Sequence, residues 1–356
     1  MEVQREDMIF DCFSFFNELD ILEIRLNVLT PVVDKFVLVE AVRRHSGEPK
    51  ELFFEKNKQR FAPFLDKIIH VVVDDEPELP PDCPKLIAAW AYENHQRNAI
   101  VRGLKGIQWD DVVIISDLDE IPNPAQVRKY AQKCVEDGVV AVFSQMSCRY
   151  YLNFVSMTMP QWRVSKMLSW KTFCDEATYA NMEQHIPMPE FANKGPTPTR
   201  VRFLRAQLEI PDGGWHFSYY GGAKQIQLKM KSIADYVCDA AADMSLEEIE
   251  RRVKAGEDPL GRGERFYAVP LDARFPDYIL EHKERYASGI LPCELVAFGT
   301  RLLCVCMRVK AWMVRVLSRC VPGWAKPAVY AVYRRIVKHP IPLMKDQLSQ
   351  KVEKGQ

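Results

Sequence analysis

Residues 111–122 read Asp-Val-Val-Ile-Ile-Ser-Asp-Leu-Asp-Glu-Ile-Pro, and their pattern indicates the class of fold. The four consecutive β-branched residues from Val112 to Ile115 predict a strand buried on both faces, as in the centre of a parallel α/β sheet. The run ends in three carboxylates, and Pro122 prevents the strand from continuing. Because ligands bind beyond the carboxyl ends of strands in open α/β sheets, these carboxylates mark a candidate site.

Asp117, Asp119 and Glu120 are the three carboxylates at the end of this run. Residues two apart in an extended chain point to the same side, so we expect Asp117 and Asp119 to aim at one point. Two hard oxygen ligands at that point favour Mg²⁺ or Mn²⁺, bridging to the diphosphate of a bound nucleotide. The alternative is a solvated turn, because an Asp-x-Asp triplet also occurs by chance in many proteins.

Strand and helix patterns alternate on both sides of this run. Before it, they predict a strand, a helix, two strands and a helix, which is the order of a doubly wound nucleotide-binding half. The predicted strands cover residues 8–16, 35–40, 67–73, 139–144 and 200–204, and the predicted helices cover residues 21–29, 86–104 and 124–135. We therefore expect an α/β fold with a Rossmann-type, mostly parallel sheet flanked by helices.

A second informative stretch runs from Ile210 to Gly222, where two Gly-Gly pairs bracket an aromatic strand. Glycine permits close approach of the backbone to a ligand, and the helix predicted over residues 223–237 presents its N-terminus, with Lys224, to a phosphate. His216 in the strand is a candidate metal ligand that completes a site of aspartate oxygens. The alternative for a single histidine is a structural role.

The composition is that of a globular protein, with 47% hydrophobic and 27% charged residues. The ten cysteines include no CxxC pair, so we expect neither a disulfide framework nor a zinc site. The formal net charge of zero hides an asymmetry, because residues 294–356 hold 12 Lys and Arg against 3 Asp and Glu. We therefore divide the chain into a catalytic domain, residues 1–293, and a C-terminal helical extension, the basic amphipathic tail of residues 294–356.

This basic tail combines arginines and aromatic residues with a nearly continuous apolar face. That combination favours helices lying on an anionic membrane surface, and the alternative is a helical pair packed on the acidic body. We recognise no signal peptide and no apolar run suited to spanning a bilayer. The expectation is a cytoplasmic protein, peripheral on the membrane, without nucleic acid as a partner.

Five motifs, in the same order along the chain, resemble glycosyltransferase family 17. They are residues 10–26, 33–40, 96–99, 117–122 (Asp-Leu-Asp-Glu-Ile-Pro) and 214–216 (Gly-Trp-His). The resemblance implies a GT-A-like fold, a UDP-sugar donor (UDP-N-acetylglucosamine in the animal members), a divalent metal ion and inversion at the anomeric carbon. It also implies that Asp117 and Asp119 form the acidic motif of the family and that His216 is its downstream histidine.

These features together predict an inverting, metal-dependent glycosyltransferase. It would move a sugar, with N-acetylglucosamine favoured, from a UDP-sugar to a glycan or glycolipid acceptor. The predicted site residues are Asp117, Asp119 and His216 for Mn²⁺ or Mg²⁺, Glu120 (favoured), Asp212 and Glu190 as general-base candidates, and Arg97, Asn98, Trp215 and Lys224 for the nucleotide and its phosphates.

Two other functions are alternatives to this one. A sugar nucleotidyltransferase would need a Gly-rich loop with Lys or Arg after the first strand, and residues 15–18, Phe-Phe-Asn-Glu, offer neither. A non-catalytic, membrane-peripheral glycan-binding protein would bind sugars through its aromatic residues but would show no metal-dependent binding of UDP.

Overall fold

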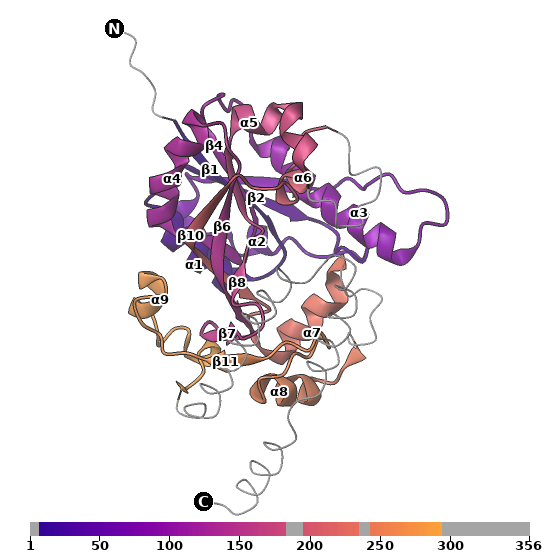
Figure 1. Cartoon of the computed structure of the whole chain (residues 1–356). Helices are drawn as coiled ribbons and strands as arrows, with labels where there is room; N and C mark the ends of the chain where they lie inside the picture. The colour runs from indigo at the N-terminus through magenta and orange to yellow at the C-terminus, as the bar shows by residue number, and fades with distance from the viewer. Residues whose placement is uncertain (1–6, 183–194, 235–242, 294–356) are drawn as a thin grey trace, which may run out of the picture. The chain divides into compact units, whose positions relative to one another are not determined.

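The computed structural model describes residues 7–182, 195–234 and 243–293 (Figure 1). Within them, eleven strands form one mixed sheet, whose main path is β11-β7-β6-β9-β4-β1-β2-β3. Off this path, β10 pairs with β5 and β6, and β8 pairs with β6. The strands are β1 (Ile9–Phe15), β2 (Lys35–Ala41), β3 (Ile68–Val73), β4 (Val112–Asp117), β5 (Glu120–Pro122), β6 (Ala141–Arg149), β7 (Phe154–Ser156), β8 (Gln161–Trp162), β9 (Lys166–Ser169), β10 (Leu208–Ser218) and β11 (Phe266–Ala268).

Short and medium-length helices connect these strands. They are α1 (Leu19–Leu29), α2 (Phe53–Lys56), α3 (Lys85–Asn98), α4 (Pro124–Glu136), α5 (Trp170–Cys174), α6 (Pro198–Arg202), α7 (Gly222–Ser232), α8 (Leu246–Lys254) and α9 (Asp277–Glu281). Among the residues described, no helix combines the length and the apolar character that a membrane span requires. The basic tail, residues 294–356, lies outside the described residues, so its helices and its membrane contact stay predictions.

The first half of the sheet is parallel. β4, β1, β2 and β3 lie side by side in that order, and each neighbouring pair runs parallel (Figure 1). Residues Val112 to Ile115 of β4 are at most 2% exposed, which confirms the expected central strand. This strand order is that of a mononucleotide-binding half, in which the crevice between the first and fourth strands receives the ligand.

The second half of the sheet is mixed. β9 pairs antiparallel with both β4 and β6, whereas β6 and β10 pair in parallel and align their carboxyl ends at Arg149 and Ser218. The longest pairings of the described sheet, β1–β2, β1–β4, β2–β3 and β6–β10, are all parallel. The expected α/β fold with a mostly parallel sheet is therefore confirmed.

Three secondary-structure predictions were wrong, and one of them is the helix predicted over residues 223–237, which ends at Ser232. Residues 200–204 were predicted as an edge strand, but Pro198–Arg202 forms α6. The reason lies just before the apolar residues, since Thr197 caps the helix through its side chain and Pro198 occupies the first turn. The helix predicted over residues 86–104 also ends early, at Asn98, and continues as a 3₁₀ turn over Ala99–Gly103.

The first glycine pair of the second stretch serves the sheet rather than a ligand. Gly214 has a φ of +129°, and a Cβ built on it would lie 2.1 Å from the Ile121 carbonyl oxygen of the neighbouring strand. A Cβ on Gly213 would lie 2.7 Å from the backbone nitrogen of Ser144 in β6. The glycines thus let β10 pass tightly between β5 and β6, and this positions the residues that follow, including His216.

Candidate functional site

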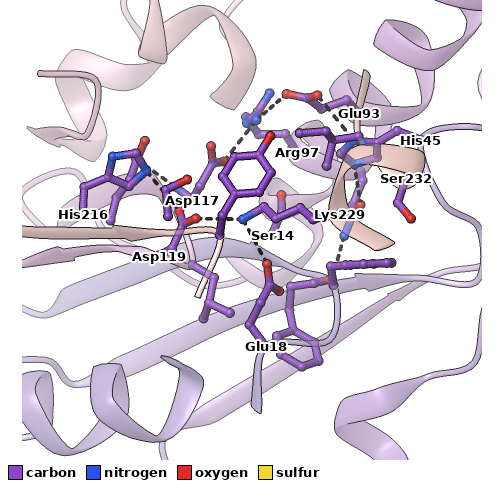
Figure 2. Close-up of a pocket in the computed structure, with 18 of the residues that line it drawn as sticks. Ser14, Glu18, His45, Glu93, Arg97, Asp117, Asp119, His216, Lys229 and Ser232 are labelled. Carbon is purple, nitrogen blue, oxygen red and sulfur yellow. Dashed lines mark hydrogen bonds and ion pairs between the residues drawn. The ribbon is translucent and has the colours of Figure 1, made fainter. Parts of the chain in front are cut away.

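A pocket lies at the carboxyl ends of β1, β4, β6 and β10, where the crevice of the parallel half is expected. Figure 2 shows side chains from several of these elements converging on it. Its charged lining residues are Glu18, Arg43, Arg44, His45, Glu93, Arg97, Asp117, Asp119, Glu120, Arg149, His216, Lys229 and Arg262. The pocket therefore combines acidic and basic side chains at the edge of the sheet where a ligand is expected.

Asp117 and Asp119 both line this pocket, and they have different partners. The Asp117 carboxylate accepts hydrogen bonds from Arg97 (3.1 Å) and Arg202 (2.9 Å). Asp119 Oδ2 instead accepts from Lys229 Nζ at 2.8 Å, and its Oδ1 lies 3.6 Å from His216 Nε2 (Figure 2). Two arginines thus hold Asp117, whereas Asp119 stands between an ammonium group and an imidazole.

The backbone brings His216 to Asp119. His216 of β10 is paired in register with Glu120 of β5, and the next amide, Phe217 N, donates to the Asp119 carbonyl at 2.8 Å. The imidazole stacks on Trp162 with ring centroids 4.5 Å apart. Its Nδ1 is buried and finds no hydrogen-bond partner within the described part of the chain.

Burial and neighbouring charges determine the charge states of Asp119 and His216. Burial raises the pKa of the Asp119 carboxyl, but Lys229 and His216 outweigh it and leave that pKa below its ordinary value. Burial lowers the pKa of His216, and the nearby carboxylates Asp119 and Glu120 oppose this only in part. Asp119 is therefore an anion and His216 a neutral imidazole near pH 7, which are the forms that bind a metal ion.

These two side chains fit a divalent ion that a nucleotide helps to bind. No group of three or more His, Cys, Asp or Glu residues suited to a metal occurs among residues 7–182, 195–234 and 243–293. Mg²⁺ and Mn²⁺, however, are often held by only one or two protein side chains, with substrate phosphates and water as the other ligands. Asp119 and His216 supply such a pair, and Asp117 would join it only by leaving Arg97 and Arg202.

Both carboxylate oxygens of Glu120 accept hydrogen bonds from other groups of the protein. It is 1% exposed, and its two oxygens accept from Trp162 Nε1 (2.6 Å), Ser165 Oγ (2.7 Å), the Arg202 guanidinium (2.7 Å) and the Asp117 amide (3.0 Å). Burial raises the pKa of Glu120, but Arg202 outweighs it and holds that pKa well below the ordinary range. A carboxylate so stabilised is a poor proton acceptor, so these contacts argue against Glu120 as the general base.

A buried arginine gives the acidic turn its shape. Arg25 of α1 is 0% exposed and pairs with Asp11 of β1 at 2.6 Å. Its Nη1 lies 2.9–3.0 Å from the carbonyl oxygens of Asp117, Leu118 and Glu120. The first helix therefore fixes the backbone of the turn that presents the carboxylates.

The side of the pocket next to β1 and β2 presents buried polar groups. Arg97 of α3 is 5% exposed and bonds Glu93 and Asp117 through Nη2. Gln96 donates to the carbonyl oxygens of Phe15 and Val39, which ties the carboxyl ends of β1 and β2 together. Arg97 Nε and Ser14 Oγ are buried without a hydrogen-bond partner among the described residues, so this side offers polar groups to a ligand.

Some predicted site residues lie elsewhere. Asn98 accepts from Thr199 N and anchors α6, and Trp215 packs in the core with Nε1 donating to the Arg274 carbonyl. Asp212 and Lys224 are exposed and are absent from the pocket lining. Glu190 lies outside the described residues and stays a prediction.

The cationic residues that line the pocket or hold the acidic turn, apart from Arg97, were missed from the sequence: Arg25, Arg43, Arg44, Arg149, Arg202, Lys229 and Arg262. For Arg25 a signal existed, because a charged residue interrupts the apolar sequence of α1, Leu-Asp-Ile-Leu-Glu-Ile-Arg-Leu-Asn-Val-Leu. Such a residue is buried only when it is paired, so a carboxylate partner was to be expected. The sequence held no such signal for the others, because they lie on segments whose positions depend on the completed fold.

Comparison with solved structures finds matches that share little sequence with this chain. A glucosyl-3-phosphoglycerate synthase from Mycobacterium tuberculosis, in complex with Mn²⁺, UDP and phosphoglyceric acid, is 13% identical and matches over 77% of this chain and 91% of that one. The same synthase with Mn²⁺ and UDP-glucose is 12% identical over the same shares. The TM-scores are 0.29 and 0.27, too low to support any argument about the site.

Curated relatives match one part of the chain. The β-1,4-mannosyl-glycoprotein 4-β-N-acetylglucosaminyltransferases of Rattus norvegicus and Homo sapiens are each 30% identical over 120 residues. That match covers 32% of this chain and 21–22% of theirs, so the chain spans about a fifth of the length of these relatives. The family model for glycosyltransferase family 17 matches residues 1–186, which is more than half of the chain and includes the acidic turn. This chain belongs to glycosyltransferase family 17.

Proposed function

We propose that this chain is an inverting glycosyltransferase of GT-A-like fold that transfers a sugar, with N-acetylglucosamine favoured, from a UDP-sugar to a hydroxyl of a glycan or glycolipid. The observation that carries the proposal is the pairing of Asp119 with His216, 3.6 Å apart, at the crevice between β1 and β4. Membership of glycosyltransferase family 17 supports the reaction class.

The donor would lie with its nucleoside toward β1, β2 and α3 and its diphosphate at the acidic turn. The Arg97 guanidinium and the Ser14 hydroxyl lie on that side, each with a buried polar atom that lacks a partner in the described part of the chain. Asn98, Trp215 and Lys224 were also predicted to bind the nucleotide. Their positions in the structure favour instead an anchor for α6, a core position and an exposed helix start.

Breaking the sugar–phosphate bond places charge on the departing UDP. A Mn²⁺ or Mg²⁺ ion held by Asp119 and His216 would act there as a Lewis acid on the phosphate oxygens. Lys229 and Arg97 line the same pocket and bring further positive charge to it in fixed positions, which favours charge that develops during the reaction. Arg202 contributes by holding Asp117 and Glu120, at 2.9 and 2.7 Å.

Inversion follows from a single displacement. The acceptor oxygen forms a bond to the anomeric carbon while the bond from that carbon to the β-phosphate oxygen breaks, and UDP leaves with the electron pair. A general base takes the acceptor proton. The oxygens of Glu120 already accept hydrogen bonds within the protein, and Asp212 is exposed outside the pocket. Of the three predicted carboxylates, Glu190 therefore remains the candidate for the general base.

The test is UDP release from UDP-N-acetylglucosamine with Mn²⁺, alongside UDP-glucose, UDP-galactose and UDP-N-acetylgalactosamine. Asp119→Asn should reduce UDP release by at least about 100-fold, as loss of a group that stabilises transition-state charge does. Asp212→Asn, an exposed carboxylate in the same strand as His216, is the matched control and should keep its activity. Undiminished release by the Asp119 variant would show that the site is wrongly assigned.

Calorimetry and an assay of diphosphate release separate this function from the other two. A glycan-binding protein without catalytic activity should bind no UDP in the presence of Mn²⁺. A sugar nucleotidyltransferase should release diphosphate from UTP and a sugar phosphate, whereas the proposed enzyme should not.

A further inference from the structure

Arg149 is a buried cation on the side of the pocket away from the proposed nucleotide. It ends β6, is 2% exposed and lines the pocket. Its partner in the sheet register is Ser218, the last residue of β10, which also lines the pocket. The aligned ends of β6 and β10 therefore bring Arg149 to the same edge of the sheet as His216, two residues before Ser218, and both side chains line the pocket.

Only one of the three guanidinium nitrogens of Arg149 has a partner among the described residues. Its Nη2 lies 3.5 Å from Glu264 Oε1, which is a long ion pair, and the other Glu264 oxygen accepts from Ser156 Oγ at 3.2 Å. Arg149 Nε and Nη1 are both buried and meet no hydrogen-bond partner in residues 7–182, 195–234 and 243–293. Arg25, by contrast, donates from all three of its nitrogens. Buried donors without partners are costly, and they indicate a ligand that completes them.

The position of Arg149 in the sheet indicates whether it would contact the donor or the acceptor. The strand order places β1 and β2 on one side of β4, and β9 and β6 on the other. Arg97, Gln96 and Ser14 lie on the β1–β2 side, which is the mononucleotide-binding half. The acidic turn after β4 lies between the two sides, so the β6 side remains for the acceptor.

On the basis of the proposed function, we propose that Arg149 binds an anionic group of the acceptor, either a phosphate or a carboxylate. A planar guanidinium group suits both, because its donors match two oxygens of either anion. The acceptor would then be a phosphorylated or acidic sugar, and Arg149 would select it over a neutral one.

The test compares simple anionic and neutral probes on the UDP-loaded protein. Glucose 6-phosphate, glucuronate, inorganic phosphate and methyl glucoside are titrated by calorimetry with and without UDP and Mn²⁺. Arg149→Met should weaken binding of the anionic probes by about 10- to 100-fold and leave methyl glucoside unchanged. Comparing glucose 6-phosphate with glucuronate identifies which anion the site prefers, and inorganic phosphate shows whether the sugar is needed.

Two further variants make the result decisive. Arg163→Met is the matched control, because Arg163 is exposed, pairs with Glu209 at 2.7 Å and lies outside the pocket lining. Arg149→Lys keeps a charge near Glu264 and loses the planar set of donors, so it should bind the anions with intermediate affinity even if Arg149→Met folds poorly. Thermal unfolding of each variant checks the fold.

Three results would overturn the inference. In the first, the anionic probes bind the unchanged protein no better than methyl glucoside. In the second, both Arg149 variants bind them as the unchanged protein does. In the third, Arg149→Met lowers affinity for UDP itself, which would place Arg149 with the donor. UDP binding and acceptor-independent UDP release by the unchanged protein report on the proposed function alone, so the two proposals fail separately.

Discussion

Lys229 Nζ lies 2.8 Å from Asp119 Oδ2, so an ammonium group already occupies one side of the carboxylate that we assign to a metal ion. The same ammonium group lies 3.1 Å from Glu18. Burial lowers the pKa of Lys229, but Asp119 and Glu18 outweigh it and raise that pKa, so the residue is charged. Lys229 therefore competes with a metal ion for Asp119 and attracts a diphosphate at the same time.

Lys229→Met should separate these two effects. Without the competing ammonium group, Mn²⁺ should bind the nucleotide-free protein more tightly, by about tenfold for one lost charge-assisted hydrogen bond. UDP without metal should bind more weakly, because a cation of the pocket is gone. Calorimetric titrations of Mn²⁺ and UDP measure both, and Lys224→Met, on the same helix but exposed, is the control. If Lys224→Met also weakened UDP binding, the original assignment of Lys224 to a phosphate would be restored.

Removal of Arg25 should destabilise the whole domain. Arg25→Met leaves the buried carboxylate of Asp11 without its partner and frees the carbonyls of the acidic turn. Breaking a buried ion pair in this way costs about 3–5 kcal/mol in the free energy of unfolding. Denaturant unfolding measures it. The double variant Asp11→Asn/Arg25→Met should cost less than the sum of the single changes, and a single-variant loss below about 1 kcal/mol would contradict the role.

His216 should make stability depend on pH in a defined window. Burial lowers its pKa from the ordinary value of 6.5, so the unfolded state binds a proton more readily than the folded state. The stabilising contribution is therefore complete above pH 6.5 and is lost as the pH falls through the lower folded value. The pKa values of Asp119 and Glu120 lie below their ordinary 3.8 and 4.5, so their contributions are lost only in more acidic solution.

The measurement is the free energy of unfolding between pH 7 and pH 5, for the unchanged protein and for His216→Gln. The variant should lose the dependence on pH in that window. Mn²⁺ affinity in the unchanged protein should fall in the same window, because a protonated imidazole cannot ligate a metal ion. A pH dependence that is the same in both proteins would assign the titration to another group.

The basic tail should determine attachment to membranes. Removal of residues 294–356 should release the protein from vesicles that contain anionic lipid, since each Lys or Arg near such a surface contributes about 1 kcal/mol. Sedimentation with vesicles measures the bound fraction, neutral vesicles are the control, and binding of the full chain should weaken with salt. Equal sedimentation of the two forms would favour a tail that packs on the acidic body.

The sequence predicted those parts of the fold and site that local pattern determines. Four β-branched residues made the central strand recognisable, and the carboxylates that follow it do line the pocket. The alternation of side chains along a strand could also have excluded Trp215 from the predicted site. Since neighbouring residues of a strand face opposite sides, Trp215 and His216 could not both serve the site, and Trp215 packs in the core.

The partners of the carboxylates could not be predicted in this way. Arg202 lies on α6, for which the apolar residues after Arg200 suggested a strand. Lys229 lies about two turns beyond Gly222, the first residue of α7. Long cationic side chains reach several ångströms from their backbone, so their targets depend on tertiary packing. The first glycine pair also has another role than the one predicted, because Gly214 accommodates a neighbouring strand and not a ligand.

The contact between Arg25 and the acidic turn spans more than ninety residues of sequence. During synthesis, the turn can reach its final shape only after β4 has emerged and joined a β1–α1 unit made long before. A fragment that begins beyond α1 would carry the acidic motif without the scaffold that shapes it. Searches for working relatives should therefore ask for an arginine in the first helix and an aspartate in the first strand together with the acidic triplet.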